Sequence, residues 1–362
     1  MGMDPQWPAE AGQIGAARDF IASCSGRVVV ASHNDVDGLS SAVIAMRALA
    51  QRGTDAEPLP SRRGEHVHED GMRARIRALR PDALIVLDMG SRPGPILPEV
   101  PTLVIDHHDA SEGSAPGALV VNGYDREPVA PSSVLTYVVC QETPGIERSA
   151  WLAALGAIAD LRTAAPFTAL LDIDARGSAW SKAVSLLNAG RRAAEDDALT
   201  ALRVLERAET VQDIVAGRVP GVERLEAYRR AVQAEVERCS RVAPLIVGET
   251  ALIRFSSGAQ VHPLVATRWS RRLAPAIVIA ANDGFLPGRV NFAIRCGSDV
   301  NLLQWLRSVP FSPSASAEYA NGHPQATGGS LTRDDFERFV DVLRRTPARR
   351  VASATQDEEG PS

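Results

Sequence analysis

The sequence lacks the features that mark secreted and membrane-spanning proteins. Its four cysteines, Cys24, Cys140, Cys239 and Cys296, stand far apart and form no Cys-x-x-Cys pair, so neither a disulfide framework nor a zinc–thiolate site is expected. No apolar run reaches the ~18–20 residues that cross a membrane. The N-terminus has no cationic start followed by an apolar run, as a secretory signal would have. We therefore expect a cytoplasmic protein with no membrane partner.

An excess of basic charge is also missing. The chain has 362 residues with 39 basic and 44 acidic side chains, which gives a net charge of −5. Lys182 is the one lysine, and the other basic residues are arginines. No global positive field exists to hold long duplex nucleic acid, so nucleic-acid binding would need a local basic patch. With 45% apolar and 23% charged residues, the composition is that of an ordinary folded protein with room for two domains.

What the sequence does contain is an alternation of strand-like and helix-like segments. The predicted strands are residues 27–32, 83–88, 102–106, 251–255, 276–281 and 290–295. The predicted helices are residues 40–50, several between 132 and 192, a long amphipathic one over 222–242, and 264–274. The first half is therefore typical of a parallel α/β sheet with both faces covered. A second, smaller α/β domain is predicted after it.

Charged residues gather where the first predicted strand ends. His33, Asp35 and Asp37 alternate along the chain, and in extended backbone alternate side chains point to the same side. Two carboxylates and an imidazole that converge are costly without a cation. The alternative is an Asp-rich turn that caps the following helix.

The next two predicted strands end in the same kind of residue. Asp88 ends one, and Asp106, His107 and His108 end the other. In open parallel sheets, ligands bind at the carboxyl ends of the strands. Asp160 lies at the end of an almost wholly apolar helix, where a carboxylate opposes the helix dipole, so a functional reason for it is favoured over a solvent-facing position.

Four short motifs occur in order along the chain. They are H-N-D-V-D-G at 33–38, L-D-M-G at 87–90, I-D-H-H at 105–108 and G-A-I-A-D at 156–160. They resemble, in the same order, the four motifs of the DHH phosphoesterase superfamily. A fifth, N-G-H-P-Q-A-T-G-G at 321–329, is similar to the Gly-Gly-His…Ala-x-Gly motif of the DHH-associated domain. That superfamily includes RecJ-like exonucleases, nanoRNases with 3′-phosphoadenosine-5′-phosphate phosphatase activity and cyclic-dinucleotide phosphodiesterases.

The resemblance implies a site for two divalent metal ions, with Mn²⁺ expected and Mg²⁺ as the alternative. A mixed set of imidazole and carboxylate ligands suits Mn²⁺, whereas Mg²⁺ prefers a site made of oxygen ligands alone. Asp106 would orient the cluster, and His108 would contact the scissile phosphate. The implied ligands are His33 and Asp35 for one ion, Asp37, His107 and Asp160 for the other, and Asp88 as the bridge.

The resemblance also implies substrate contacts outside the metal site. Gly322, Gly328 and Gly329 are expected in a glycine-rich loop, where they would allow close backbone approach to a ligand, and His323 and Arg295 would bind a phosphate or hydroxyl. Asn321 stands where the family has a glycine, which puts the recognition of the substrate's end in doubt. Arg191 lies in N-A-G-R-R, which resembles a stretch in RecJ-like members but is also typical of the end of a helix.

These observations predict an α/β fold with a DHH catalytic domain, a smaller DHH-associated domain and an active-site cleft between them. The expected boundaries are an N-terminal segment 1–24, the catalytic domain 25–215, a linker helix 216–244, the substrate domain 245–347 and a disordered tail 348–362. His66 and His68 lie outside the motifs and are interpreted as surface-loop residues, with lining of the cleft as the alternative.

The predicted function is that of a two-metal phosphodiesterase, a RecJ-like exonuclease acting on single-stranded DNA or RNA or on short oligonucleotides. One alternative is a nanoRNase, 3′-phosphoadenosine-5′-phosphate phosphatase or cyclic-dinucleotide phosphodiesterase. An alternative of another class is a non-catalytic scaffold associated with nucleic acid, for which degenerate metal motifs would be typical. The resemblance is also compatible with a homodimer.

Overall fold

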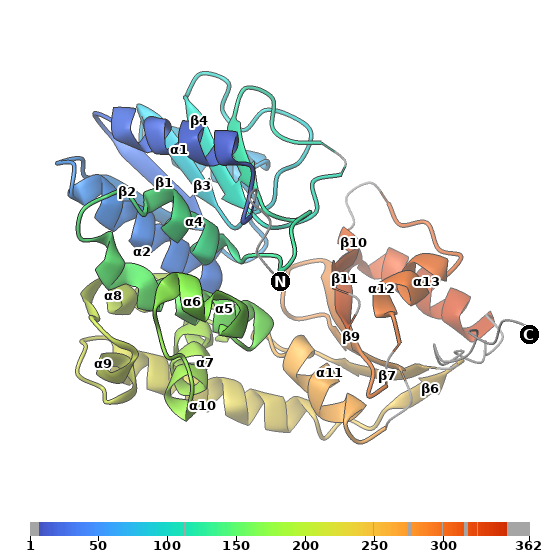
Figure 1. Cartoon of the computed structure of the whole chain (residues 1–362). Coiled ribbons are helices and arrows are strands. Elements are labelled where there is room, and N and C mark those ends of the chain that lie inside the picture. Colours follow the sequence, from blue (N-terminus) through green and yellow to red (C-terminus); the bar gives the residue numbers. More distant parts are fainter. Residues whose placement is uncertain are drawn as a thin grey trace, which may run out of the picture. The chain divides into compact units, whose positions relative to one another are not determined.

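The computed structural model describes residues 7–345 except 112, 249, 274–276, 299, 315–317 and 324, and it leaves the side chains of residues 318 and 321–323 undescribed. The chain forms two compact units (Figure 1). The first extends to Arg191 and also contains Asp196–Arg229. The second contains Arg192–Glu195 and the chain from Arg230 onward. Among the described residues, none of the helices combines the length and the apolar character of a membrane-spanning segment.

The first unit is built on a five-stranded sheet in which every pairing is parallel, with the strand order β2-β1-β3-β4-β5. The three central strands are buried at every position, as expected when both faces of a parallel sheet are covered. Because all the strands are parallel, their carboxyl ends lie along one edge of the sheet. The strands are β1 (Val28–Ser32), β2 (Ala56–Pro60), β3 (Ala83–Leu87), β4 (Thr102–Asp106) and β5 (Leu119–Asn122).

Helices cover this sheet. Helix α2 (Val36–Ala50) packs on β1 and on α4 (Ser132–Cys140) and α5 (Ala150–Leu161). Met72 and Ile76 of α3 (Asp70–Ala78) join a separate core cluster with Val29 and Leu84 of the sheet. The other helices are α1 (Ala11–Ser23), α6 (Thr168–Leu171), α7 (Ser178–Arg192), α8 (Ala198–Arg207) and α9 (Val211–Val215), with short 3-10 turns at Ile146–Ser149 and Ala165–Phe167. Helix α10 (Val222–Cys239) begins in the first unit and continues past Arg229 into the second.

The second unit contains a six-stranded mixed sheet with the order β10-β11-β9-β8-β7-β6. Phe292 of the sheet packs against Phe336 and Phe339 in its core. The strands are β6 (Leu245–Val247), β7 (Thr250–Phe255), β8 (Ile277–Asn282), β9 (Arg289–Arg295), β10 (Glu318–His323) and β11 (Ala326–Thr332). The helices are α11 (His262–Ser270), α12 (Leu302–Ser308) and α13 (Arg333–Arg345). The predicted fold class, a parallel α/β sheet and a second, smaller α/β part, is confirmed.

Two local expectations were wrong. Helix α2 begins at Val36, so Asp37 is helical and does not lie in the extended backbone that aligned it with His33 and Asp35. Asp35 accepts a hydrogen bond from the Gly38 amide and caps this helix, which allows it to start early. The motif at 321–329, treated as a loop, forms the antiparallel pair β10 and β11.

Candidate metal centre

Acidic and imidazole side chains meet at the carboxyl edge of the parallel sheet. Asp88 follows β3 directly, and Asp106 is the last residue of β4, with His107 and His108 after it. His33 follows β1 in the same way. Because these strands are neighbours and parallel, the three chain segments leave the sheet side by side. The strand ends predicted from the sequence therefore carry residues that the structure also places together.

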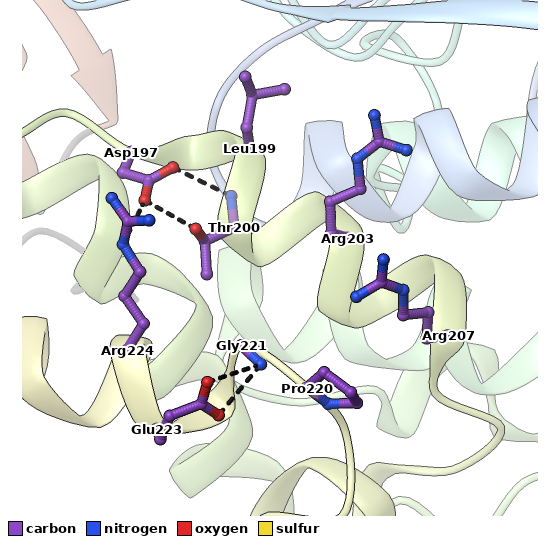
Figure 2. Close-up of a pocket in the computed structure, with 9 residues that line it drawn as sticks. All are labelled: Asp197, Leu199, Thr200, Arg203, Arg207, Pro220, Gly221, Glu223 and Arg224. Atoms are coloured by element: carbon purple, nitrogen blue, oxygen red, sulfur yellow. Dashed lines mark hydrogen bonds and ion pairs between the residues drawn. The ribbon is translucent and has the colours of Figure 1, made fainter.

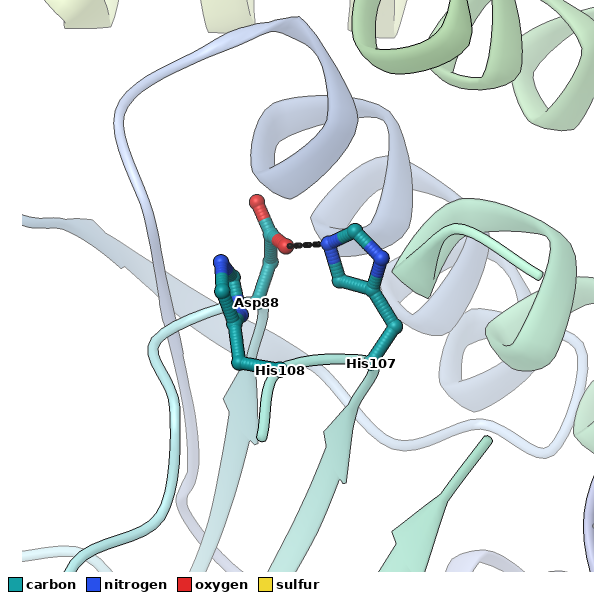
Figure 3. A group of neighbouring side chains, drawn as sticks. All are labelled: Asp88, His107 and His108. Atoms are coloured by element: carbon teal, nitrogen blue, oxygen red, sulfur yellow. Dashed lines mark ion pairs between the residues drawn. The ribbon is translucent and has the colours of Figure 1, made fainter. Parts of the chain in front are cut away.

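Asp88 lies beside His107 and His108 (Figure 3). Its Oδ1 is 3.3 Å from Nε2 of His107, whereas its Oδ2 is 3.5 Å from Nδ1 of His33. The two carboxylate oxygens thus face different histidines. Two sets of potential metal-ligand atoms, each within 4.8 Å, share this residue: one with His33 and Asp35, the other with His107 and His108. Asp88 also has a left-handed backbone, with a φ of 61°.

Asp35 and Arg191 extend the His33 side of the site. Oδ2 of Asp35 is 2.9 Å from Nδ1 of His33. Arg191, near the end of α7, brings Nη2 to 4.0 Å from the same Asp35 oxygen, and its Nε donates to Oδ1 of Asn188. Arg191 thus lies in the last turn of a helix and next to a candidate ligand.

Asp37 approaches the site from the first turn of α2 and is buried. Its Oδ2 accepts the amide of Ser132 at 2.8 Å, and its Oδ1 accepts the amide of Ser133 at 3.1 Å. These are amides of the first turn of α4, which have no partner inside their own helix. Gly156 of α5 lies against the same carboxylate, so three helices define its position.

The remaining predicted ligand and the two predicted catalytic residues lie on the His107 side. Oδ2 of Asp160 is 3.9 Å from Nδ1 of His107, and the Asp160 carboxyl is partly exposed. Oδ1 of Asp106 is 2.9 Å from Nδ1 of His108 and accepts the amide of Gly90 at 3.1 Å. Asp106 is fully buried, while the His108 side chain is 49% exposed. Asp106 thus joins the ends of β3 and β4 and fixes the His108 ring.

The charges in the site perturb one another strongly. Burial opposes the charged form of His33, but Asp35 and Asp88 outweigh it and raise the pKa of His33 to about 10. Burial also opposes the charged form of His107, but Asp88, Asp37 and Asp160 outweigh burial and raise the pKa of His107 to about 10.

The pKa values of the carboxylates shift in different directions, depending on the neighbouring groups. Burial, reinforced by Asp88, raises the pKa of Asp37 well above its ordinary value. Burial also opposes the charge of Asp106, but His108 lowers the pKa of Asp106 to about 2. The site is thus a dense group of carboxylates that needs positive countercharge, and its donor set of imidazoles and carboxylates fits divalent transition metals.

The sequence did not single out several residues that shape this site. The Ser132 hydroxyl donates to Oδ1 of Asp88 at 3.0 Å. The side-chain amide of Asn122, at the end of β5, donates to the His108 carbonyl at 2.9 Å. Gly38, which the H-N-D-V-D-G motif did include, must be small, since a Cβ there would lie 2.6 Å from the carbonyl oxygen of His33. Asn122 carried a usable signal, because β5 ends beside β4; the two serines of P-S-S carried none that distinguishes them from a helix start.

His66 and His68 lie beside the turn that carries Asp88. The His68 amide donates to Nδ1 of His66 at 3.2 Å. The Arg92 amide donates to Nε2 of His68, also at 3.2 Å. His66 hydrogen-bonds the Met89 backbone, while burial and Arg92 lower the pKa of His66 to about 3. Neutral His66 therefore supports the turn after β3.

The residues expected to bind substrate in the second unit lie on neighbouring strands. Arg295 ends β9, and one guanidinium nitrogen donates to the Ile294 carbonyl at 2.8 Å. Gly328 and Gly329 lie in β11, and a Cβ on Gly328 would be 2.2 Å from the Phe292 carbonyl oxygen. Close strand packing thus accounts for Gly328. Gly322 and His323 belong to β10, and their side-chain positions fall outside the described residues.

A separate cavity of about 450 Å³ in the first unit contains none of the predicted site residues. It lies between α8 and the start of α10 (Figure 2). Asp197 caps α8 and also pairs with Arg224, so its charge is neutralised within the wall. Arg203 in turn pairs with Glu206. The lining residues are Asp197, Leu199, Thr200, Arg203, Arg207, Pro220, Gly221, Glu223 and Arg224.

Comparisons with known proteins agree with this geometry. Residues 27–161 match the family model described as DHH family, N-terminal domain. The fold is similar to RecJ from Thermus thermophilus in complex with Mn²⁺, with a TM-score of 0.70 and 20% identity over 94% of this chain and 55% of that one. It is also similar to an exonuclease RecJ bound to manganese, with a TM-score of 0.63 and 19% identity over 96% of each chain.

A third similar structure is the DHH domain of a member of the S1p family of ribosomal proteins. Its TM-score is 0.58 at 15% identity, over 93% of this chain and 91% of that one. At these identities the likeness shows a shared fold. This chain spans 55% of the Thermus RecJ chain. No curated protein matches the sequence.

Proposed function

We propose that this chain, whose residues 27–161 match the DHH family, is a metal-dependent phosphoesterase that hydrolyses single-stranded nucleic acid or short oligonucleotides from one end with two divalent cations. The observation that carries the proposal is the division of the Asp88 oxygens between His107 and His33. A carboxylate with one oxygen toward each of two ligand groups suits a bridging ligand. The manganese in the two RecJ structures of similar fold supports Mn²⁺ as the metal, with Mg²⁺ as the alternative.

The proposed ligand groups follow the two sides of Asp88. His33 and Asp35 would hold one ion. Asp37, His107 and Asp160 would hold the other ion. His107 lies next to Asp160, and Asp37 is close enough to His107 to raise the pKa of that histidine. Bound divalent cations supply Lewis-acid stabilisation of the phosphodiester and activation of the attacking water.

The protein's own groups hold the phosphate and order the site. Nδ1 of His108 is occupied by Asp106, which leaves Nε2 as the ring nitrogen for a phosphate oxygen. Because Asp106 also accepts the backbone amides of Gly90 and His108, its carboxylate keeps that ring in one orientation. Arg191 lies close enough to Asp35 to add positive charge beside the substrate. Arg295, Gly322, His323, Gly328 and Gly329 remain proposed substrate contacts of the second unit.

Two other functions give different results in the same assay. A nanoRNase, 3′-phosphoadenosine-5′-phosphate phosphatase or cyclic-dinucleotide phosphodiesterase would use the same metal ligands on a smaller substrate. A non-catalytic scaffold would hydrolyse nothing. All six proposed ligand residues are present in the sequence, which favours an enzyme over a scaffold.

The test is hydrolysis in Mn²⁺ of end-labelled single-stranded DNA and RNA of equal length, a dinucleotide, a cyclic dinucleotide and 3′-phosphoadenosine-5′-phosphate. Stepwise shortening of the long strands supports the exonuclease, and labels at each end give its direction. Cleavage of small substrates alone supports the phosphatase or dinucleotide alternatives. Chelation with EDTA is expected to abolish turnover, and added Mn²⁺ to restore it. Turnover that survives exhaustive chelation contradicts the metal mechanism.

A further inference from the structure

Ser132 connects two candidate metal ligands that come from different elements. Its backbone amide donates to Oδ2 of Asp37 at 2.8 Å, and its hydroxyl donates to Oδ1 of Asp88 at 3.0 Å. Asp37 belongs to α2, and Asp88 follows β3. Ser132 is the first residue of α4 and is completely buried, so water does not compete for these bonds. Ser132 thus hydrogen-bonds to the carboxylates of both Asp37 and Asp88.

The bond to Asp88 fixes a torsion that the side chain itself leaves free. The terminal torsion of aspartate is broad, so the carboxylate orientation depends on what surrounds it. Here the Ser132 hydroxyl contacts the same oxygen, Oδ1, that lies 3.3 Å from Nε2 of His107. With Oδ1 held on that side, Oδ2 is left facing His33 at 3.5 Å. A rotated carboxylate would no longer present one oxygen to each histidine.

We propose that Ser132 is a positioning residue that sets the rotation of the Asp88 carboxylate, so that this residue can serve two metal positions. The inference rests on the proposed two-metal function and adds a residue to it. Ser132 contacts neither substrate nor metal in this scheme and acts only through Asp88. Its loss should therefore weaken the sharing of Asp88 more than the binding of the first ion.

Ser133 offers a closely matched control. It is the next residue of α4, is equally buried, and also gives its amide to Asp37. Its hydroxyl, however, donates to the Ala153 carbonyl at 3.2 Å and not to a carboxylate. Ser132→Ala and Ser133→Ala each remove one buried hydroxyl hydrogen bond and keep both amides. The two variants should lose similar stability and differ only at Asp88.

The experiment measures Mn²⁺ binding to the metal-free full chain by calorimetry, and the spin coupling of a bound Mn²⁺ pair by electron paramagnetic resonance. Ser132→Ala is expected to keep one tight Mn²⁺, to bind the second about 10–100-fold more weakly and to lose the coupled signal. Its kcat should fall with little change in KM, while Ser133→Ala, whose lost hydroxyl contacts no carboxylate, should keep the second Mn²⁺ and the coupled signal. Ser132→Thr, which keeps a hydroxyl, should restore part of the second site.

The outcomes separate the two proposals. If the wild type binds two ions and Ser132→Ala binds both as tightly, the role of Ser132 is refuted and the two-metal function stands. Equal weakening in Ser132→Ala and Ser133→Ala also refutes it, since a general loosening of α4 would then explain both. If the wild type itself binds fewer than two Mn²⁺ ions, both the two-metal function and this inference fail.

Discussion

Gly156 leaves room for the carboxylate of Asp37. A Cβ atom on Gly156 would lie 2.4 Å from Oδ1 of Asp37 and 2.1 Å from Oγ of Ser133, well inside van der Waals contact. Gly156 is in the middle of α5, where glycine is about 1 kcal/mol less favourable than alanine. The helix therefore accepts an unfavourable residue to let the buried carboxylate and the start of α4 approach it. The glycine of the G-A-I-A-D motif thus has a steric function.

We expect Gly156→Ala to lower both stability and hydrolysis. Overpacking of this kind costs about 1–3 kcal/mol, and here it would also push Asp37 away from the amides that hold it. Gly71→Ala in α3 is the control, because an added Cβ there meets nothing within 4 Å. Urea unfolding and kcat of the two variants make the comparison. A Gly156→Ala enzyme as stable and active as the wild type would contradict the steric interpretation.

Asp88 provides a second prediction because substitutions can separate the effect of its left-handed backbone from the effect of its carboxylate. Its φ of 61° suits asparagine better than alanine, for which left-handed backbone costs roughly 1–2 kcal/mol. Asp88→Asn and Asp88→Ala should both abolish hydrolysis and weaken Mn²⁺ binding, since each removes the shared carboxylate. Only Asp88→Ala should also lower the unfolding free energy appreciably. Full activity in Asp88→Asn would rule out the bridging role.

Much of the candidate metal site could be predicted from the sequence because strand ends of a parallel sheet converge. His33, Asp88 and His107 could be placed together from three neighbouring strands with the same direction. The backbone geometry predicted for Asp37 was wrong, since extended backbone does not continue past Asp35. Asp37 reaches the site from the first turn of a helix, and the motif resemblance, not the alternation of side chains, identified it.

What escaped prediction depends on contacts between segments far apart in the sequence. Ser132 lies 44 residues from Asp88, and no local pattern connects them. Strand β2 contains Pro58 and Pro60, which are unfavourable in a central strand, and it occupies a sheet edge where they are tolerated. The motif at 321–329 was interpreted as a ligand-binding loop because of its glycines. Close packing of β11 on β9 requires one of those glycines, Gly328.

Arg295 is the residue of the second unit whose proposed role is simplest to test. Arg295→Ala should raise KM more than it lowers kcat, because a remote phosphate contact contributes to binding in the ground state and transition state alike. Arg289→Ala, in the same strand, is the control. Arg289 donates to the hydroxyl and carbonyl of Ser330 at 2.7 and 2.6 Å, so its loss should lower stability without raising KM. An unchanged KM in Arg295→Ala argues against the substrate contact.

Asp197 ties α8 to α10 and should contribute stability without contributing to catalysis (Figure 2). It accepts hydrogen bonds from the amide and hydroxyl of Thr200, at 3.1 and 2.7 Å, and from the Tyr228 hydroxyl at 2.9 Å. Arg224 pairs with it at 3.1 Å. Asp197→Ala removes a helix cap and these contacts between helices, so we expect a loss of about 1–3 kcal/mol with kcat unchanged.

The contribution of Asp197 should depend on pH in a defined direction. Burial opposes its charge, but Thr200, Tyr228 and Arg224 outweigh burial and lower the pKa of Asp197 in the folded protein. The ionised form is therefore favoured by folding, and its stabilisation is complete above the ordinary aspartate pKa of about 3.9. It is lost as the pH falls through the lower pKa of the folded state. Urea unfolding of the wild type and Asp197→Ala should differ most near neutral pH and converge in acid; a difference that stays constant down to pH about 2 would contradict this assignment.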